Sequence, residues 1–393
     1  MSWARLLFWG SAAMIAYAYL LFPALLLVRG RLVRRPYRSA DITPPITVII
    51  AARDEVQAIG AKLDNLRSLD YPPDRLEVIV VSDGSTDGTD TVVSRVDDPR
   101  IRLLAVPRLG KADALNAGIR EARGDILVFS DANSLYAQSA LRALVRPFAD
   151  PTVGGVAGDQ RYTSGTRGGT SDGERRYWDF DRALKRAESA SGNTISATGA
   201  IYAVRRALAE PVVRGVTDDF FVSTGVIARG YRLVFAEDAI AFEPVASSGR
   251  GEFGRKVRVI TRGLRGVLLR RGLLDPRRHG FYALQLLSHK VLRRLVAVPL
   301  LMLPIAGAIL WRDGAPYRLA TLAQLLFYGC GAVGIAVGPT GRRTPFGIAA
   351  YFCLVNAASL VAVFNLLRGH RIEQWQPDRQ PFGRAQRRGP NGG

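Results

Sequence analysis

The chain has 393 residues, of which 48% are hydrophobic, and a formal net charge of +20. This length and apolar content predict one large folded domain or two modest ones, and argue against a disordered chain. Two cysteines lie inside apolar runs, and three histidines are scattered without ligand spacing. A disulfide framework and a zinc enzyme are therefore not expected.

The positive charge comes almost entirely from arginine, since only five of the 54 basic residues are lysines. An arginine-rich genome would explain this composition without functional meaning. The alternative is a membrane partner, because the basic residues crowd next to the most hydrophobic segments. No recognised nucleic-acid module occurs in the sequence, so nucleic acid is not an expected partner.

Residues 6–29 form an apolar run that carries no charge before Arg29. Its length suffices to cross a hydrocarbon core of about 30 Å. The run is followed by RGRLVRRPYR rather than by a small-residue cleavage site, which predicts a retained transmembrane helix over residues 5–29. The same basic cluster predicts that the following part of the chain faces the cytoplasm.

Residues 42–245 are expected to form one domain in which short strands alternate with helices. Near-continuous apolar runs predict buried parallel strands at 46–52, 78–82, 101–106 and 125–131. Helical patterns at 58–69 and 111–122 lie between them, which predicts an α/β fold with right-handed crossovers. Ligands bind beyond the carboxyl ends of such strands, where Asp83 and Asp131 lie.

Residues 246–290 are predicted to be a basic interfacial segment. Ten basic residues between 250 and 278 stand against Glu252 and Asp275, and they alternate with apolar residues at roughly helical spacing. This pattern predicts a helix that lies on the inner leaflet of a membrane. A solvated basic helix on the soluble domain is the alternative.

Three apolar runs, at 295–311, 317–338 and 346–367, predict about three transmembrane helices within residues 291–368. The first is marginal in length and contains Pro299 and Pro304. Three further crossings would put the arginine-rich tail, residues 369–393, outside the cell against the positive-inside rule. Either the first run is re-entrant or the tail, which we expect to be disordered, breaks that rule.

Six short motifs follow one another along the chain: IIAARDE (49–55), VVSDGSTDGT (80–89), GKADALNAG (110–118), SDAN (130–133), TGAIYAVRR (198–206) and VTDDF (216–220). In order and spacing they resemble glycosyltransferase family 2, whose inverting enzymes carry a GT-A catalytic domain and use nucleotide-sugar donors. The resemblance covers about 46–265 and is greatest to the membrane-anchored polysaccharide-synthase branch. It implies an α/β GT-A domain, with a Rossmann-like mixed sheet, flanked by transmembrane helices.

The resemblance also implies which residues bind the donor. The backbone near Ala51 and Arg53, together with Glu55 and Asp83, would hold the base and the ribose. Asp83 would accept from a uracil N–H, which favours a uridine donor, although an aspartate at this place also commonly caps a turn. Asp87, at the start of the next helix, is predicted to be its N-cap.

Lys111 opens a predicted helix, where free N–H groups and the helix dipole favour an anion such as the donor diphosphate. An exposed surface lysine is the alternative. The family binds Mg²⁺ or Mn²⁺ with an Asp-x-Asp motif, which here reads Asp131-Ala132-Asn133. Asn133 offers a neutral oxygen, so Asp131 would be the chief ligand and also touch the donor. A capping role for Asn133 stays open.

Asp219 matches the family's general base, which removes the proton of the acceptor hydroxyl. The neighbouring carboxylate of Asp218 would raise its proton affinity, although two acidic residues are also favoured at any helix start. Gly199 and Ala200 of TGAIYAVRR would form the acceptor-side wall, small enough for a sugar to approach, and Asp218 would also lie on the acceptor side.

The Gln-x-x-Arg-Trp motif usual in processive synthases is missing, because the corresponding region reads FGRKVRVITRGLRG. Arg258 and Arg262 in this region are predicted diphosphate contacts. Without a tryptophan to stack on the acceptor, transfer of one or a few sugars is favoured over continuous polymerisation.

The sequence therefore predicts a membrane-bound inverting glycosyltransferase at the cytoplasmic face of the inner (plasma) membrane. It would move a sugar from a UDP-sugar to a lipid-linked or saccharide acceptor for cell-envelope or exopolysaccharide synthesis. A processive synthase that also translocates its polymer is the first alternative. A non-catalytic membrane protein that binds nucleotide sugars is the second, but it would have no need for Asp219.

Overall fold

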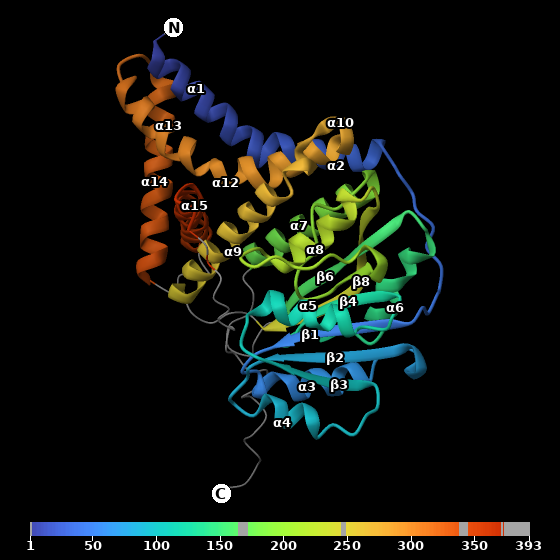
Figure 1. The fold of residues 1–393 in the computed structure, drawn as a ribbon. Coiled ribbons are helices and arrows are strands. Elements are labelled where there is room, and N and C mark those ends of the chain that lie inside the picture. The colour runs from blue at the N-terminus through green and yellow to red at the C-terminus, as the bar shows by residue number, and fades with distance from the viewer. Residues whose placement is uncertain (1, 164–171, 245–248, 338–344, 371, 373–393) are drawn as a thin grey trace, which may run out of the picture. The chain divides into compact units, whose positions relative to one another are not determined.

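The computed structural model describes residues 2–163, 172–244, 249–337, 345–370 and 372 (Figure 1). These residues divide into two compact units. The helical unit comprises residues 1–29, 171–184 and 247–372, and the sheet unit comprises residues 30–170 and 185–246. The division falls within helices α2 (Phe22–Leu32) and α7 (Asp172–Ser191), and each unit is described by itself below.

The sheet unit is built on one mixed sheet of eight strands in the order β3-β2-β1-β4-β7-β6-β8-β5 (Figure 1). Strands β1, β2, β3 and β4 are parallel to one another, whereas β7 is antiparallel to both β4 and β6. The strands are β1 Ile46–Ala52, β2 Leu76–Asp83, β3 Ile101–Val106, β4 Ile126–Asp131, β5 Leu135–Tyr136, β6 Val153–Thr163, β7 Tyr202–Arg205 and β8 Arg232–Pro244. The mixed α/β fold predicted from the sequence is confirmed, and the four predicted strands correspond to β1 to β4.

Helices cover both faces of the sheet because the strand side chains alternate in direction. Val48 and Ile50 of β1 share a core with Leu63 of α3, whereas Ile49 faces α5 next to Gly118. Every residue of β1 is buried, as expected for a central parallel strand. The helices of this unit are α3 Val56–Arg67, α4 Thr89–Ser94, α5 Lys111–Glu121, α6 Ala140–Val145, the end of α7 Asp172–Ser191, and α8 Asp218–Ala228.

The order of the first strands creates a switch point in the sheet between β1 and β4. β1 pairs with β2 on one side and with β4 on the other, so the chain changes direction of winding between β1 and β4. Crevices at such switch points, beyond the carboxyl ends of the strands, are the usual binding sites of open α/β sheets. Ala51 pairs with Asp131 in the parallel register, which brings the ends of β1 and β4 to the same level.

The helical unit contains segments that are long and apolar enough to cross a membrane. Within the described ranges these are Trp3–Leu32, Ala315–Val337 and Phe346–Leu367. Phe281–Leu295 and Ala297–Ile309 meet at a bend of 51° and would be a fourth span if they act as one. The helices are α1 Trp3–Ala16, α2 Phe22–Leu32, α9 Gly249–Leu269, α10 Pro276–His279, α11 Phe281–Leu286, α12 Arg293–Leu295, α13 Ala297–Ile309, α14 Ala315–Val337 and α15 Pro345–Leu367.

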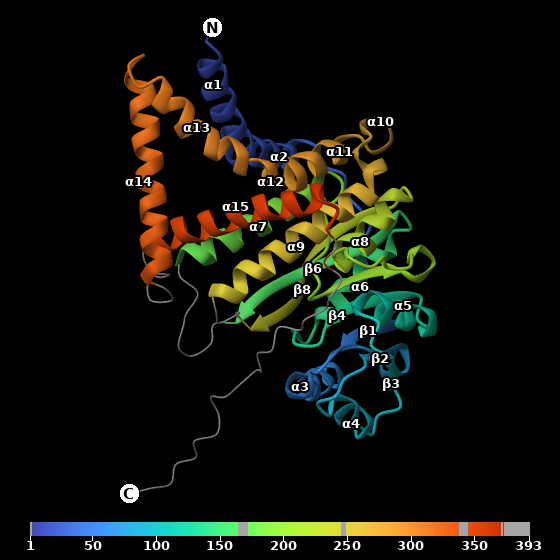
Figure 2. The same cartoon turned by 60° about the vertical axis from the view of Figure 1, so that its left-hand side comes forward.

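One prediction about this unit needs correction. The basic helix predicted over 250–278 ends at Leu269, and a 3₁₀ turn, Arg271–Leu274, separates it from α10, which begins at Pro276 and is capped by the side chain of Asp275. The apolar run predicted over 295–311 contains α13, which forms the second part of the bent pair, so a re-entrant element stays a prediction. α15 packs on α9 through Ala358 and Ala362 (Figure 2). The tail beyond residue 372 lies outside the described residues.

Gly124 packs tightly against the first residues of β1. A Cβ at Gly124 would lie 2.5 Å from the backbone of Ile46 and Thr47 in β1, which cannot move without breaking the sheet. Gly124→Ala should therefore lower the free energy of unfolding by roughly 1–3 kcal/mol. Thermal unfolding in detergent measures this loss.

Gly60→Ala is the matched control, because its Cβ would meet nothing closer than 3.7 Å and it lies inside α3. There alanine should be neutral or stabilising by up to about 1 kcal/mol. Equal losses in both variants would contradict the proposed collision at Gly124.

Candidate active site

The loops after β1 and β2 are joined by hydrogen bonds. The backbone N–H of Asp54 donates to Ser85 at 3.2 Å, and the Asp54 carboxylate accepts from the backbone N–H of Thr86 at 2.9 Å. Asp54 has a φ of 52°, a left-handed conformation that Asp tolerates better than most residues. These contacts hold Arg53 and Glu55, two predicted donor-binding residues, beside the loop that follows β2.

Asp83 ends β2 and is fully buried. Its carboxylate accepts from the backbone N–H groups of Leu109 at 2.7 Å and Gly110 at 2.9 Å. Asp83 therefore anchors the loop that leads into α5 and so positions Lys111. A contact between Asp83 and the base of a donor stays a prediction.

Asp87 caps the starts of two helices. One carboxylate oxygen accepts from the backbone N–H of Thr89 in α4 and the other from that of Val56 in α3, both at 3.0 Å. The N-cap of α4 is nevertheless Gly88, whose φ of 98° favours glycine. The prediction of Asp87 as the N-cap is therefore wrong by one residue.

Lys111 brings two carboxylates together at the carboxyl edge of the sheet. Its ammonium lies 2.8 Å from Asp131 at the end of β4 and 3.1 Å from Asp218 at the start of α8. All three side chains are less than a third exposed. Burial alone would lower the pKa of Lys111, but the two carboxylates outweigh it and raise that pKa above its ordinary value.

Gly199 makes room for Asp131. A Cβ at this position would lie 2.7 Å from the Asp131 carboxylate, so a side chain here would displace it. Ala200, by contrast, is 1% exposed and belongs to the hydrophobic core. The prediction that Ala200 lines the acceptor site is wrong for this structure, because its side chain faces the core; Gly199 as part of that wall stays a prediction.

Asp219 follows Asp218 in the first turn of α8, and its carboxylate lies 2.7 Å from the backbone N–H of Phe220. Tyr202 of β7 is fully buried, and its hydroxyl has no hydrogen-bond partner among the described residues. Burial and the charges of Asp218, Asp219 and Asp131 raise the pKa of Tyr202. The sequence analysis missed Tyr202, although it lies in TGAIYAVRR. Its antiparallel pairing with Phe129 on β4 is what brings it near the carboxylates.

A divalent cation fits this cluster. Asp131 and Asp218 already share one positive charge, the Lys111 ammonium, and Asn133 offers an amide oxygen from a partly exposed position. The described residues contain no group of three or more His, Cys, Asp or Glu side chains that could hold a metal ion. Donor phosphates and water would therefore complete the ligand set, as they do in many magnesium sites.

Glu55 adds to the negative charge of this edge. Burial raises its pKa to about 7, and the carboxylates of Asp131, Asp87 and Asp54 act in the same direction. The charge of Lys111 opposes this shift. Glu55 is therefore half protonated near neutral pH when no cation other than Lys111 is present.

Three predicted residues remain, Ala51, Arg258 and Arg262. Ala51 is a buried residue of β1, and only its backbone is available to a ligand. Arg258 and Arg262 lie on α9 of the helical unit, where Arg262 donates to the backbone carbonyl of Ile372 at 2.7 Å. Their contact with a diphosphate stays a prediction.

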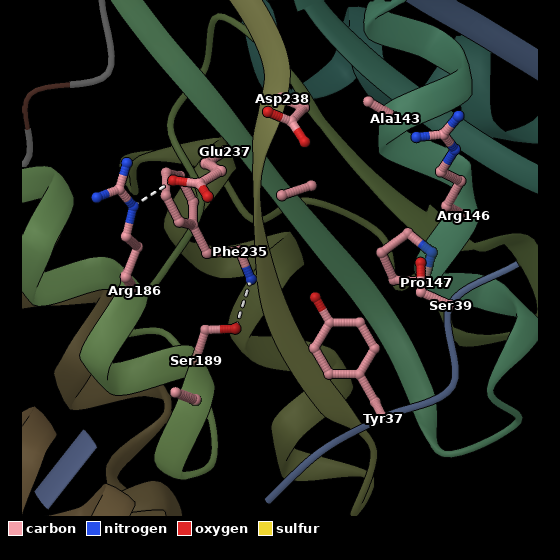
Figure 3. A pocket seen from close by; sticks show the side chains of 12 residues that line it. Tyr37, Ser39, Ala143, Arg146, Pro147, Arg186, Ser189, Phe235, Glu237 and Asp238 are labelled. Carbon is pink, nitrogen blue, oxygen red and sulfur yellow. Dashed lines mark hydrogen bonds and ion pairs between the residues drawn. The ribbon is translucent and has the colours of Figure 1, made fainter. Parts of the chain in front are cut away.

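A separate hollow of about 350 Å³ in the sheet unit contains none of the predicted site residues (Figure 3). Arg186 and Glu237 form an ion pair on its wall, and the backbone N–H of Phe235 donates to Ser189 at 2.9 Å.

Comparison with known proteins supports the fold. The family model described as Glycosyl transferase family 2 matches residues 47–212. Residues 47–212 therefore form a glycosyltransferase family 2 domain. A mannosyltransferase from Pyrobaculum calidifontis, solved in complex with GDP-Man and Mn²⁺, has 28% identity and a TM-score of 0.71 to this family 2 chain. The similarity covers 92% of this chain and 99% of that one, and it supports the GT-A fold.

Two curated relatives have named products. A poly-β-1,6-N-acetyl-D-glucosamine synthase of Staphylococcus aureus is 26% identical over 238 residues, which are 59% of this chain and 57% of the relative. A β-monoglucosyldiacylglycerol synthase of Synechocystis is 36% identical over 118 residues, which are 29% of this chain and 25% of the relative. The family 2 chain thus spans little more than half the length of the first relative.

The raised pKa of Glu55 predicts a pH-dependent stability. Its folded value of about 7 lies above its ordinary value of 4.5, so the folded state binds more protons between these values. The stability from Glu55 is present below about pH 4.5 and is lost as the pH rises through 7. Glu55→Gln should therefore melt a few °C above the parent at pH 8 and show a smaller difference at pH 5. A difference that does not change between these pH values, without nucleotide or added metal, would contradict the shift.

Gly199→Ala should remove activity without unfolding the protein, because its Cβ forces the Asp131 carboxylate out of place. We expect a loss of about 10²-fold in nucleotide release from a nucleotide sugar, since small displacements in a catalytic site are costly. Gly192→Ala is the control, as its Cβ would meet nothing within 4 Å. Equal activity of the two variants would show that Asp131 tolerates the displacement.

Proposed function

We propose that this family 2 chain is a membrane-bound inverting glycosyltransferase that works at the cytoplasmic face of the inner membrane. It transfers a sugar from a nucleotide-sugar donor to a lipid-linked or saccharide acceptor in cell-envelope or exopolysaccharide synthesis. The catalytic domain comprises about residues 42–245. The observation that carries the proposal is the meeting of Lys111, Asp131 and Asp218 at the switch point of the sheet, with Asp219 beside them.

In this mechanism the acceptor hydroxyl attacks the anomeric carbon of the donor sugar while the bond to the diphosphate breaks. Asp219 accepts the hydroxyl proton as the new bond forms. Lys111 supplies a fixed positive charge to the diphosphate, near the start of α5. A divalent cation held by Asp131 and Asn133 would supply further charge to stabilise the leaving diphosphate.

A uridine nucleotide is the proposed donor, with GDP-sugars as the competitor to test. The uridine proposal rests on Asp83, but the carboxylate of Asp83 is engaged by Leu109 and Gly110 in this structure. The similar mannosyltransferase was solved with GDP-Man, which makes a guanosine donor a specific alternative. The ribose and diphosphate contacts would be shared by both donors.

Two acceptor classes remain in competition. The similarity to a monoglucosyldiacylglycerol synthase favours a lipid acceptor, and the similarity to a poly-N-acetylglucosamine synthase favours a growing polysaccharide. The missing Gln-x-x-Arg-Trp motif supports transfer of one or a few sugars. A processive synthase is therefore the second candidate, and a non-catalytic nucleotide-sugar binding protein is the third.

Purified protein in detergent should be given a panel of UDP- and GDP-sugars with Mg²⁺ or Mn²⁺ and a lipid extract as acceptor source. We expect nucleotide release from one donor, suppression by a chelator, and a loss of about 10²- to 10⁴-fold in Asp219→Asn. Asp64→Asn is the matched control, because this carboxylate lies on the exposed surface of α3.

The products separate the candidates. A single glycolipid supports transfer of one sugar, whereas a ladder of lengths supports the processive synthase. Tight binding of a nucleotide sugar without any release of nucleotide would support the non-catalytic protein. An Asp219→Asn variant as active as the parent would remove Asp219 from the mechanism.

A further inference from the structure

Lys62 is a fully buried lysine in the middle of α3, on the face that packs against the sheet. Lysine is almost never buried completely, because its ammonium loses the hydration of a full charge. An apolar side chain of similar length would fill the same space without that loss. The question is therefore which group in this core requires a positively charged donor.

The ammonium of Lys62 binds the chain just after Asp131, Ala132 and Asn133. It donates to the backbone carbonyl of Ser134 at 2.7 Å and lies 3.4 Å from the Ser134 hydroxyl. It also lies 3.6 Å from the centre of the Tyr136 ring, over its face. One turn further along α3, Asn65 donates to the Tyr136 carbonyl at 2.9 Å and accepts from its N–H at 2.7 Å. Two side chains of one helix thus hold residues 134–136.

Ser134 connects Lys62 to the backbone of Asp131 and of Ala200. Its hydroxyl lies 2.9 Å from the backbone carbonyl of Asp131 and 3.1 Å from that of Ala200. Ala200 follows Gly199, whose missing side chain leaves room for the Asp131 carboxylate. The buried network from Lys62 therefore reaches the backbone on both sides of that carboxylate.

The charge of Lys62 also acts on this cluster. Burial lowers its pKa to about 7, while the charges of Asp131 and Glu243 act in the opposite direction. When Lys62 is protonated, its charge offsets part of the negative potential of Asp131. Geometry and charge thus point to the same turn, Asp131–Asn133.

We propose that Lys62 is a positioning residue that holds the turn carrying Asp131 and Asn133, and that it thereby sets the affinity of this turn for a divalent cation bound with a nucleoside diphosphate. Lys62 does not touch the substrate; it acts through Ser134. The inference rests on the proposed function in one respect, namely that this turn binds the metal and diphosphate of a donor. Residues outside a metal's own ligands commonly change metal affinity or activity by 10- to 100-fold when they are mutated.

The test is Lys62→Met, which keeps a chain of similar length but removes the charge and the donors. Mn²⁺ binding is followed in full-length protein in detergent by the loss of the electron paramagnetic resonance signal of free Mn²⁺, with UDP and with GDP. We expect Lys62→Met to remain folded and to bind Mn²⁺ about 10-fold more weakly. At saturating Mn²⁺ most of its turnover should return, whereas a loss of stability alone would lower kcat at every metal concentration.

Ile59→Val is the control on the same buried face of α3, since it shortens an apolar side chain that makes no hydrogen bond. It should bind Mn²⁺ like the parent even if it melts at a lower temperature. If Lys62→Met does not fold, Ser134→Ala decides, because it cuts the hydroxyl link to Asp131 and should weaken Mn²⁺ binding severalfold. Unchanged Mn²⁺ binding in the folded variant would overturn the proposal.

The outcomes for Lys62 and for the overall function are separable. A parent protein that binds Mn²⁺ and nucleotide but transfers no sugar would refute the transferase function, while weaker binding in Lys62→Met would still support the role of Lys62. A parent that transfers sugar but shows no difference in Mn²⁺ binding from Lys62→Met would refute the role of Lys62 alone. A parent that binds no Mn²⁺ with either nucleotide would refute both the metal site and the role of Lys62.

Discussion

The sheet unit depends on one electrostatic constraint, which is that several carboxylates must lie together at one edge of the sheet. Asp131 and Asp218 arrive there from β4 and α8, and Glu55 and Asp54 add further negative charge. Burial raises the pKa of Glu55, and repulsion from the neighbouring carboxylates raises it further. The ammonium of Lys111 offsets this repulsion from within the cluster. The same arrangement of charges would suit a divalent cation bound together with a diphosphate. The cation would add positive charge beside the carboxylates, and the Lys111 ammonium would then be free to bind the negatively charged diphosphate.

The topology of the sheet explains why the cluster forms at this place. β1 and β4 are neighbours with parallel register, so the loops that follow them open at the same level. Glycine at 199 then allows the antiparallel part of the sheet to approach the Asp131 carboxylate closely. Buried polar groups below the edge, among them Lys62 and Ser134, are hydrogen-bonded to the backbone of the turn rather than to solvent. Such networks hold a site in one geometry when every member is satisfied.

Relatives of this family 2 chain carry names for different products, a polysaccharide in one case and a glycolipid in another. One fold supports several functions because the site, not the fold, selects the chemistry. The proposed donor site lies at the carboxyl ends of β1 and β4, where Lys111 and Asp131 form an ion pair.

The sequence by itself determined the α/β class, the first four strands, the apolar helices at both ends and the order of the six motifs. These features are local: runs of β-branched residues, apolar stretches of sufficient length, and short polar groups at strand ends each leave a pattern within a few residues. It also named Lys111, Asp131 and Asp218, because the resemblance to a family carries residue positions directly. The sequence did not predict the hydrogen bonds of Asp83, because its partners Leu109 and Gly110 lie 26 and 27 residues away.

Only the tertiary structure decided which small residue faces the site and which faces the core, as Gly199 and Ala200 show. It alone brought Lys62 under the Asp131–Asn133 turn, 72 residues from Ser134, and placed the hydroxyl of Tyr202 near three carboxylates. A lysine in an amphipathic helix and a tyrosine in a strand look ordinary in a sequence. Whether these side chains are buried depends on which elements pack over them. That packing is set by contacts between residues far apart in the chain, which local sequence patterns do not show.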